Sequence, residues 1–187
     1  MRKLVLSDHD GLLYKGKIVP SAGIITDIAI EALRRAPART LPAGICYGLA
    51  ALGAVEFDQY RASELMSKML GKLGVGDEAM EAILLSLDGS VPEAIAALEA
   101  QRDQYTRVGI LSSSPKGWIE RLHEGRFDLV IGSSPEAPVR RPEDKAKILD
   151  CLACEYDSVV YEGHSRLELA RIGRRLESAN VKLRLVK

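Results

Sequence analysis

Two aspartates near the start of the chain are spaced so that their carboxylates could share one site. Asp8 and Asp10 directly follow Leu4-Val5-Leu6, a short apolar run that is typical of a buried parallel strand. Because the two aspartates lie two residues apart just past a strand end, both side chains can point toward one cleft. Two carboxylates so close repel each other, which favours a bound cation or raises one of the two pKa values.

The chemistry that such a pair could perform is phosphoryl transfer. A hard, oxygen-binding ion such as magnesium would relieve the repulsion and would also neutralise phosphate oxygens. One carboxylate could attack phosphorus to give an aspartyl phosphate. The other could protonate the leaving alcohol and later remove a proton from the hydrolytic water.

Further polar side chains follow the other predicted strands or begin the helices beside them. A serine hydroxyl and a lysine ammonium can hold the oxygens of a transferring phosphoryl group. The Asp-His-Asp-Gly segment alone is equally typical of a capping turn, so the prediction of a site depends on the combination. In chain order the additional groups are Ser112, Ser113, Ser114, Lys145, Glu162, His164 and Glu168.

Strands and helices alternate in the second half of the chain. The predicted strands are Leu4–Leu6, Arg107–Leu111, Asp128–Gly132, Ser158–Tyr161 and Val181–Val186. The predicted helices are Pro92–Gln104, Lys116–His123, one that begins at Asp144, and Leu167–Ser178. This order implies right-handed βαβ crossovers and therefore an α/β fold, with a Rossmann-like parallel sheet and helices on both faces.

Residues 15–87 show a different pattern, with helical periodicity and no convincing strand. The expected helices are one from Ser21, then Pro42–Ala54, Asp58–Lys72 and Asp77–Ser86. We therefore expect an α/β core of residues 1–14 and 88–187, into which an all-helical cap of residues 15–87 is inserted. Because ligands bind beyond the carboxyl ends of strands in an open parallel sheet, the site should lie at that edge of the core.

The composition is that of a folded domain without a charge bias. The chain has 187 residues, of which 47% are hydrophobic, and its 26 lysines and arginines equal its 26 aspartates and glutamates. There is accordingly no electrostatic case for binding nucleic acid or an anionic membrane. No apolar run approaches the roughly 18 residues of a membrane span, and the first residues do not form a secretory signal. Three cysteines make no disulfide framework, so we expect a cytoplasmic protein. The oligomeric state stays open.

Four segments resemble, in the correct order, the motifs of the haloacid dehalogenase superfamily. The segment Leu4–Leu13 resembles the first motif, an apolar strand that runs into Asp-x-Asp-Gly-Thr. Val108–Ser112 resembles the second, Lys145 resembles the lysine of the third, and Val159–Glu168 resembles the fourth, which ends in Gly-Asp-x-x-x-Asp. The likeness covers the whole sheet domain, and the helical insert is similar to the small helical cap of this family.

The resemblance implies a role for each acidic residue. Asp8 would be the nucleophile and Asp10 the general acid and base. Mg²⁺, or another divalent metal, would be held by Asp8, the Asp10 carbonyl and the acids of the fourth motif, for which Glu162 and Glu168 are the candidates in this sequence.

The resemblance also implies a phosphate-binding set. Ser112, Ser113 and Lys145 would hold the phosphate oxygens. Arg141, which precedes Pro142 as a lysine often does in relatives, is a second candidate for the role of Lys145. We prefer Lys145 because of its helical register.

The chain departs from the family pattern at two positions. Leu12 stands where a threonine is usual, and His164 replaces the first aspartate of the fourth motif. Imidazole suits transition metals better than magnesium and adds no negative charge, so we expect weakened metal binding or a changed metal preference. We expect His9 to fill space beside the nucleophile, and His123 to be a helix-end residue.

The predicted function is that of a phosphatase which hydrolyses a small phosphorylated metabolite through an aspartyl phosphate. Asp10 argues against the dehalogenase branch, whose chemistry does not need an acid to protonate a leaving alcohol. The alternative is a binding or scaffold protein that has kept the fold and turns over poorly, an interpretation motivated by His164 and Leu12.

Overall fold

One five-stranded sheet forms the centre of the part of the chain that the structure describes. The structure is a computed structural model and describes residues 1–15, 34, 85, 89–134 and 136–186. All neighbouring strands are parallel, in the order β3-β2-β1-β4-β5. The strands are β1 (Lys3–Ser7), β2 (Thr106–Pro115), β3 (Leu129–Ser133), β4 (Ser158–Gly163) and β5 (Val181–Leu185).

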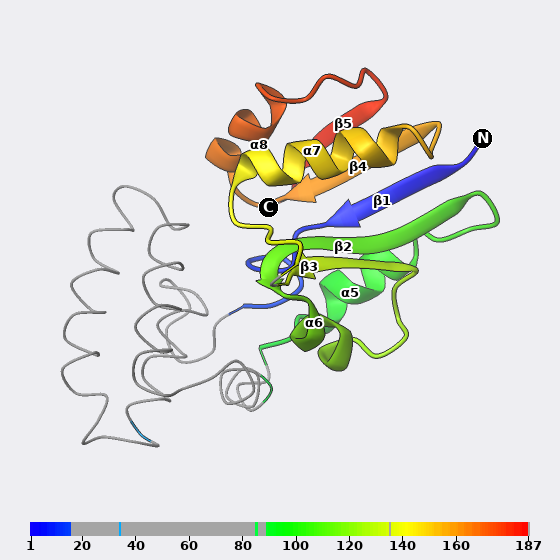
Figure 1. The fold of residues 1–187 in the computed structure, drawn as a ribbon. Helices are drawn as coiled ribbons and strands as arrows, with labels where there is room; N and C mark the ends of the chain where they lie inside the picture. Colours follow the sequence, from blue (N-terminus) through cyan, green and yellow to red (C-terminus); the bar gives the residue numbers. More distant parts are fainter. Residues whose placement is uncertain (16–33, 35–84, 86–88, 135, 187) are drawn as a thin grey trace. The chain divides into compact units, whose positions relative to one another are not determined.

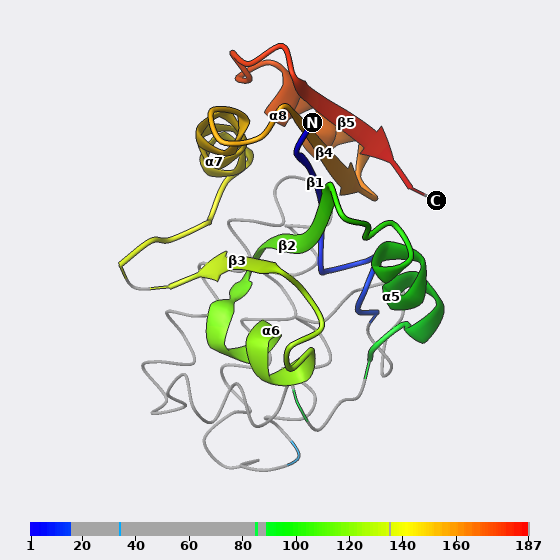
Figure 2. The same cartoon turned by 90° about the vertical axis from the view of Figure 1, so that its right-hand side faces the viewer.

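Helices cover both faces of this sheet. They are α5 (Pro92–Glu99), α6 (Lys116–Leu122), α7 (Pro142–Ala153) and α8 (Arg166–Gly173). The helices α7 and α8 lie on one face, and α5 and α6 lie on the other (Figures 1 and 2). The predicted α/β class, a Rossmann-like parallel sheet with helices on both faces, is confirmed.

A hydrophobic core lies between the sheet and the α7–α8 layer. Side chains of one strand parity point into it, including Leu4 and Leu6 of β1 and Tyr161 of β4, while Leu149 of α7 and Ile172 of α8 meet them. All five side chains are fully buried. Because alternate residues of a strand face opposite sides, this register turns the intervening Val5 toward α5 and α6.

Two helices end earlier than their sequence pattern predicts, and an aspartate binds backbone amides in the segment that follows each of them. After α5, the Asp103 carboxylate accepts from the amides of Tyr105 at 2.7 Å and Thr106 at 2.8 Å, which turns the chain into β2. After α8, the Asp150 carboxylate on α7 accepts from the amides of Glu177 and Ser178. Side-chain acceptors compete with helical carbonyls for amides, and hydrophobic periodicity does not register that competition.

The chain divides into two compact units. One comprises Met1–Tyr14 and Ser90–Lys187, and the other comprises Lys15–Gly89. The helices predicted within residues 15–87 lie outside the described residues, so the all-helical character of the cap stays a prediction.

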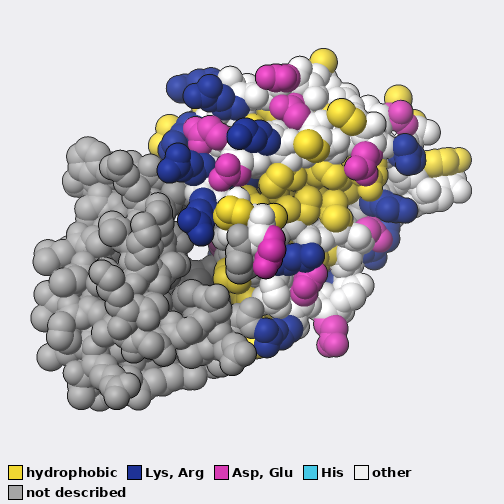
Figure 3. All heavy atoms as spheres, viewed as in Figure 1, with side chains coloured by type: hydrophobic (Ala, Val, Ile, Leu, Met, Phe, Trp, Pro, Cys, Tyr) yellow, Lys and Arg dark blue, Asp and Glu magenta, His cyan; other side chains and the backbone are white. Residues whose placement is uncertain are grey.

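The surface of the described residues carries charges of both signs. On the face shown in Figure 3, lysines and arginines alternate with aspartates and glutamates around a group of hydrophobic side chains. Cys151 of α7 and Cys154 at the end of this helix are exposed. In the described part of the chain, no helix combines the length and the apolar character needed to cross a membrane.

Candidate active site

The strand order places the first pair of carboxylates at the switch point of the sheet. The chain moves from β1 outward to β2 and β3 on one side, and then to β4 and β5 on the other. The crevice beyond the carboxyl ends of β1 and β4 is therefore the expected ligand site. The Asp8 amide donates to the Glu162 carbonyl at 2.8 Å, which holds the ends of these two strands side by side.

A buried lysine from α7 organises the acidic side chains there. The Lys145 Nζ lies 3.1 Å from Asp8 Oδ1, 2.7 Å from Glu168 Oε1 and 2.8 Å from the Tyr161 hydroxyl. Lys145 is 1% exposed, Asp8 4% and Glu168 5%. One ammonium thus compensates two buried carboxylates, and each of its three donors has a partner.

Asp8 is held as a carboxylate anion. Burial by itself would raise the pKa of Asp8, but the charge of Lys145 and the hydrogen bond from His164 outweigh it and bring the pKa below its usual value. The His164 Nδ1 lies 3.6 Å from Asp8 Oδ2. The same contact with Asp8 raises the pKa of His164 against the opposing effect of burial.

His164 is seated against the loop that follows β1. Gly11 in this loop has a φ of +83°, a conformation that only glycine adopts readily. A Cβ atom on Gly11 would lie 2.7 Å from the His164 ring. The glycine therefore serves both the turn and the space that the imidazole occupies.

Asp10 is fixed by donors from two other elements. Its Oδ2 accepts from the Ser114 hydroxyl at 2.7 Å and lies 3.5 Å from the Ser112 hydroxyl, both at the end of β2. Its Oδ1 lies 3.1 Å from the His9 Nδ1. The Asp10 side chain is 33% exposed, so a ligand can reach it while its two oxygens stay bonded.

His9 is a completely buried member of an aromatic cluster. Its ring stacks on Tyr14 and meets the Trp118 ring edge-on, with a centroid distance of 4.8 Å. The His9 Nε2 lies 3.0 Å from the Nε2 of His123, which follows the last residue of α6 as predicted. Burial and the charges of His9 and Arg126 lower the pKa of His123 to about 4.

Three residues named from the sequence lie apart from these contacts. Glu162 points its carboxylate to Arg184, at 2.8 Å, and to Gln101, at 3.4 Å. Arg141 is exposed just before α7, and Ser113 is half-buried between the two serines that approach Asp10. The roles assigned to these three residues stay predictions.

Three contacts at the site were not expected from the sequence. Tyr161 accepts from Lys145, and it could have been suspected because a tyrosine in a buried strand needs a partner for its hydroxyl. The Ser114 hydroxyl donates a short bond to Asp10, a contact that the sequence predicted for no serine. The contact of His9 with His123 has no signal in the sequence, because 114 positions separate the two residues.

The donor set does not fit the magnesium site of the family pattern. Asp8 and the Asp10 carbonyl are available, but His164 stands at the third position and Glu168 is bonded to Lys145. Among the described residues, no group of three or more histidine, cysteine, aspartate or glutamate side chains surrounds a common point. Magnesium prefers several oxygen ligands in octahedral geometry, which these side chains do not supply.

Solved structures show the same fold. The chain has a TM-score of 0.57 and 17% identity to a candidate phosphoglycolate phosphatase from Lactobacillus plantarum, over 98% of this chain and 86% of that one. A haloacid dehalogenase family enzyme from Bacteroides thetaiotaomicron, in complex with magnesium and inorganic phosphate, has a TM-score of 0.51 and 13% identity to this chain. The match covers 100% of this chain and 95% of that one. A 2-haloacid dehalogenase from Pseudomonas syringae has a TM-score of 0.51 and 15% identity, over 94% of this chain and 84% of that one.

These comparisons define the fold class. The chain has the fold of the haloacid dehalogenase-like superfamily, as its four motif-like segments predicted. No protein-family model matches the sequence, and no curated protein matches it. The similar structures include a candidate phosphatase and a dehalogenase, so the fold alone does not select the reaction.

Removal of the buried ammonium should destabilise the protein strongly. We expect Lys145→Met to lower the free energy of unfolding by about 3–5 kcal/mol, because it leaves Asp8 and Glu168 buried without their cation. Adding Glu168→Gln should recover part of this loss. Lys147→Met, at an exposed position of the same helix, should change stability by less than about 0.5 kcal/mol in the same urea titrations. Equal effects of the two lysine substitutions would contradict this arrangement.

The lowered pKa of His123 predicts a loss of stability in acid. Between the usual pKa of 6.5 and the native value of about 4, the unfolded chain binds a proton that the folded chain does not. Stability therefore falls as the pH decreases through this window, by about 3 kcal/mol from this group. Urea unfolding of the wild type and of His123→Gln, each at about pH 7 and about pH 4, measures this loss of stability. An identical pH dependence of the two proteins would exclude this contribution.

His164 can be replaced by the aspartate that the family resemblance leads us to expect at this position. We expect His164→Asp to bind Mg²⁺ at least about tenfold more tightly than the wild type, because a carboxylate adds both an oxygen ligand and a negative charge. His164→Asn, which removes the imidazole without adding charge, is the matched control. Isothermal titration calorimetry with MgCl₂ measures all three proteins. A wild type that binds Mg²⁺ as tightly as His164→Asp would overturn the expectation.

Proposed function

We propose that the protein is a phosphohydrolase that acts on a small phosphomonoester through an aspartyl-phosphate intermediate. One observation carries the proposal: Asp8 is a buried carboxylate anion paired with Lys145, and a second, hydrogen-bonded carboxylate, Asp10, lies two residues away at the switch point of the sheet. Two carboxylates in unlike environments suit the roles of nucleophile and acid–base catalyst.

The first step is transfer of the phosphoryl group to Asp8. The Asp8 Oδ1 is occupied by the Lys145 ammonium and by the His9 amide at 3.1 Å, so Oδ2 is the oxygen that attacks phosphorus. The new bond joins Oδ2 to phosphorus as the ester oxygen–phosphorus bond breaks. Asp10 donates its proton to the departing alkoxide, which leaves as the alcohol.

The second step returns the enzyme to its initial state. Asp10, now a carboxylate, takes a proton from water, and the water oxygen attacks the phosphorus of the aspartyl phosphate. The bond between Asp8 and phosphorus breaks, which releases inorganic phosphate and restores the Asp8 carboxylate. Ser112, Ser113 and Lys145 are the groups proposed to hold the phosphoryl oxygens in both steps.

The similar structures support this proposal to different degrees. One is described as a candidate phosphoglycolate phosphatase, and another was solved with magnesium and inorganic phosphate. Asp10 supports a phosphatase rather than a dehalogenase, because dehalogenation needs no acid to protonate a leaving alcohol. Because the donor set does not fit magnesium, we propose that any assisting Mg²⁺ or other divalent metal binds weakly.

The proposal is tested by comparing the wild type with Asp8→Asn. The wild type should hydrolyse p-nitrophenyl phosphate or a member of a panel of small phosphomonoesters, and Asp8→Asn should lose at least about a thousandfold in kcat. Mass spectrometry of the acid-quenched wild type should find a phosphoryl group on Asp8. Asp157→Asn, at an exposed aspartate, is the control and should retain activity.

The same comparison decides the alternative of a binding or scaffold protein. The contact of His164 with Asp8 is the observation that favours this alternative, because it places an imidazole where a metal ligand is usual. A wild type no faster than Asp8→Asn, with or without added divalent metal, and with no phosphoryl group on Asp8, would establish it.

A further inference from the structure

A line of three side chains leads from the candidate acid–base residue into the protein. The Asp10 Oδ1 contacts the His9 Nδ1 at 3.1 Å, and the His9 Nε2 contacts the His123 Nε2 at 3.0 Å. Only Asp10 is partly exposed, while His9 is 0% and His123 3% exposed. Nothing in the proposed reaction requires two buried histidines behind Asp10, so their arrangement needs its own explanation.

The contacts determine which atoms of the two rings carry protons. The Asp10 Oδ1 accepts hydrogen bonds both when Asp10 is ionised and when its acid proton sits on Oδ2, so in both states the His9 Nδ1 must carry a proton to bond it. A neutral His9 then has a bare Nε2, which accepts from a proton on the His123 Nε2. If His9 carries both protons, it donates to a bare His123 Nε2 instead. In either arrangement, the His123 contact keeps the His9 Nδ1 proton directed at Asp10.

The surroundings of His9 prevent its ring from turning. The Tyr14 ring stacks on the His9 ring, with 5.6 Å between the centroids and 22° between the planes. The Trp118 ring meets the His9 ring edge-on, with 84° between the planes. These contacts fix the plane of the imidazole but do not choose between its two tautomers. The choice depends on the polar partners at the two ends of the ring, Asp10 Oδ1 beside Nδ1 and His123 Nε2 beside Nε2.

The Asp10 carboxylate is consequently bonded at both oxygens. Ser114 at the end of β2 donates to Oδ2 at 2.7 Å, and His9 holds Oδ1. A carboxylate held at two points keeps one orientation while the leaving group approaches, and proton transfer is sensitive to that orientation.

We propose that His9 and His123 are positioning residues for Asp10. His123 supports the His9 tautomer that donates to Asp10, and His9 orients the Asp10 carboxyl group for proton transfer to the leaving-group oxygen. This inference rests on the proposed phosphohydrolase function and adds two residues to it. His9 stands at the variable position of the first motif-like segment, and His123 lies outside all four segments.

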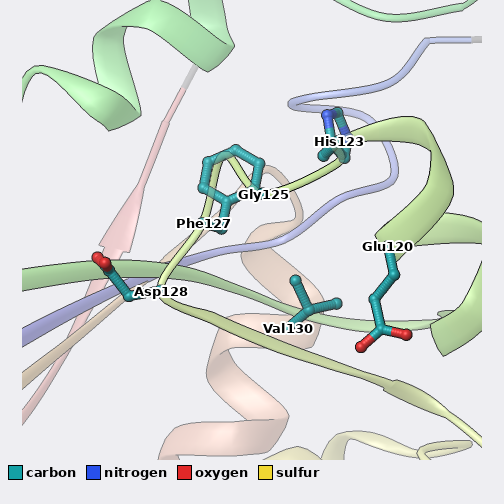
Figure 4. A pocket seen from close by; sticks show the side chains of 6 residues that line it. All are labelled: Glu120, His123, Gly125, Phe127, Asp128 and Val130. Carbon is teal, nitrogen blue, oxygen red and sulfur yellow. The ribbon is translucent and has the colours of Figure 1, made fainter.

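His123 is the better of the two for a test because it is remote from the reacting groups. Its other side faces a pocket of about 260 Å³, which Figure 4 shows with Glu120, Gly125, Phe127, Asp128 and Val130 around it. A change at His123 therefore alters the support of His9 while Asp8, Asp10 and Ser114 keep their own contacts.

Two substitutions of His123 separate hydrogen bonding from packing. His123→Gln can place an amide N–H near the position of the imidazole Nε2 and should preserve the support of His9. His123→Phe keeps a ring of similar size and loses the polar contact. The matched packing control is Phe127→Leu. It removes the aromatic ring whose centroid lies 5.3 Å from that of His123 and leaves the hydrogen bonds of His9 and His123 in place.

The readout is the dependence of kcat/KM on the leaving group. This constant reports the phosphorylation of Asp8, in which a basic alkoxide leaving group needs the proton of Asp10 and p-nitrophenolate does not. We expect His123→Phe to reduce kcat/KM for β-glycerol phosphate by at least about tenfold and for p-nitrophenyl phosphate by less than about threefold. His123→Gln and Phe127→Leu should keep the wild-type ratio of the two constants.

A spectroscopic measurement accompanies the kinetics. Long-range proton–nitrogen NMR of the imidazole rings near neutral pH should find the His9 proton on Nδ1 in the wild type and in His123→Gln, and a mixture of tautomers in His123→Phe. Thermal unfolding of each variant shows whether it is folded.

The outcomes distinguish the inference from the proposed function. An inactive wild type contradicts the proposed function, and the inference falls with it. With an active wild type, equal losses on both substrates, an unchanged ratio in folded His123→Phe, or a His9 Nδ1 that carries no proton would overturn the inference alone.

Discussion

The buried ammonium of Lys145 is the interaction on which the rest of the site depends. Without it, Asp8 and Glu168 would be two carboxylates in a nearly water-free crevice, and such groups either acquire a cation or become protonated. A protonated Asp8 would be a poor nucleophile. The ammonium thus favours the charged form of Asp8 and occupies its Oδ1, and the same lysine ties α7 and α8 to the end of β1.

The topology of the sheet determines which residues meet this ammonium. Because β1 is the central strand and its neighbours are β2 and β4, the ends of three strands surround Asp8 and Asp10. The parity of β4 sends Tyr161 to the same side as Lys145 and sends Glu162 to the opposite side, where Arg184 of β5 pairs with it. A shift of β4 by one residue would exchange these two side chains. The site therefore requires this register as much as it requires these residue types.

The fold and part of the site could be predicted from the sequence because they follow from local patterns. The features that were not predicted depend on contacts that such patterns do not record. Strand alternation and strand-end acids follow from local periodicity, so the parallel sheet and the meeting of Asp8 with Lys145 could be predicted. The early end of α8 could not, because the carboxylate of Asp150 on another helix captures the amides that follow it. The partnership of His9 with His123 is purely tertiary. Only the packing of α6 against the sheet brings its last turn to the loop after β1.

The replacement of an acid by His164 changes the electrostatics of the site in a defined way. An aspartate at this position would add a third negative charge beside Asp8 and Glu168, which a single lysine could not neutralise, and a metal ion would then be required. An imidazole adds no negative charge, and its contact with Asp8 raises its own pKa toward the charged form. His164 thereby reduces the need for an external cation beside Asp8. The glycine at position 11 completes this exchange, since any side chain there would displace the ring from Asp8.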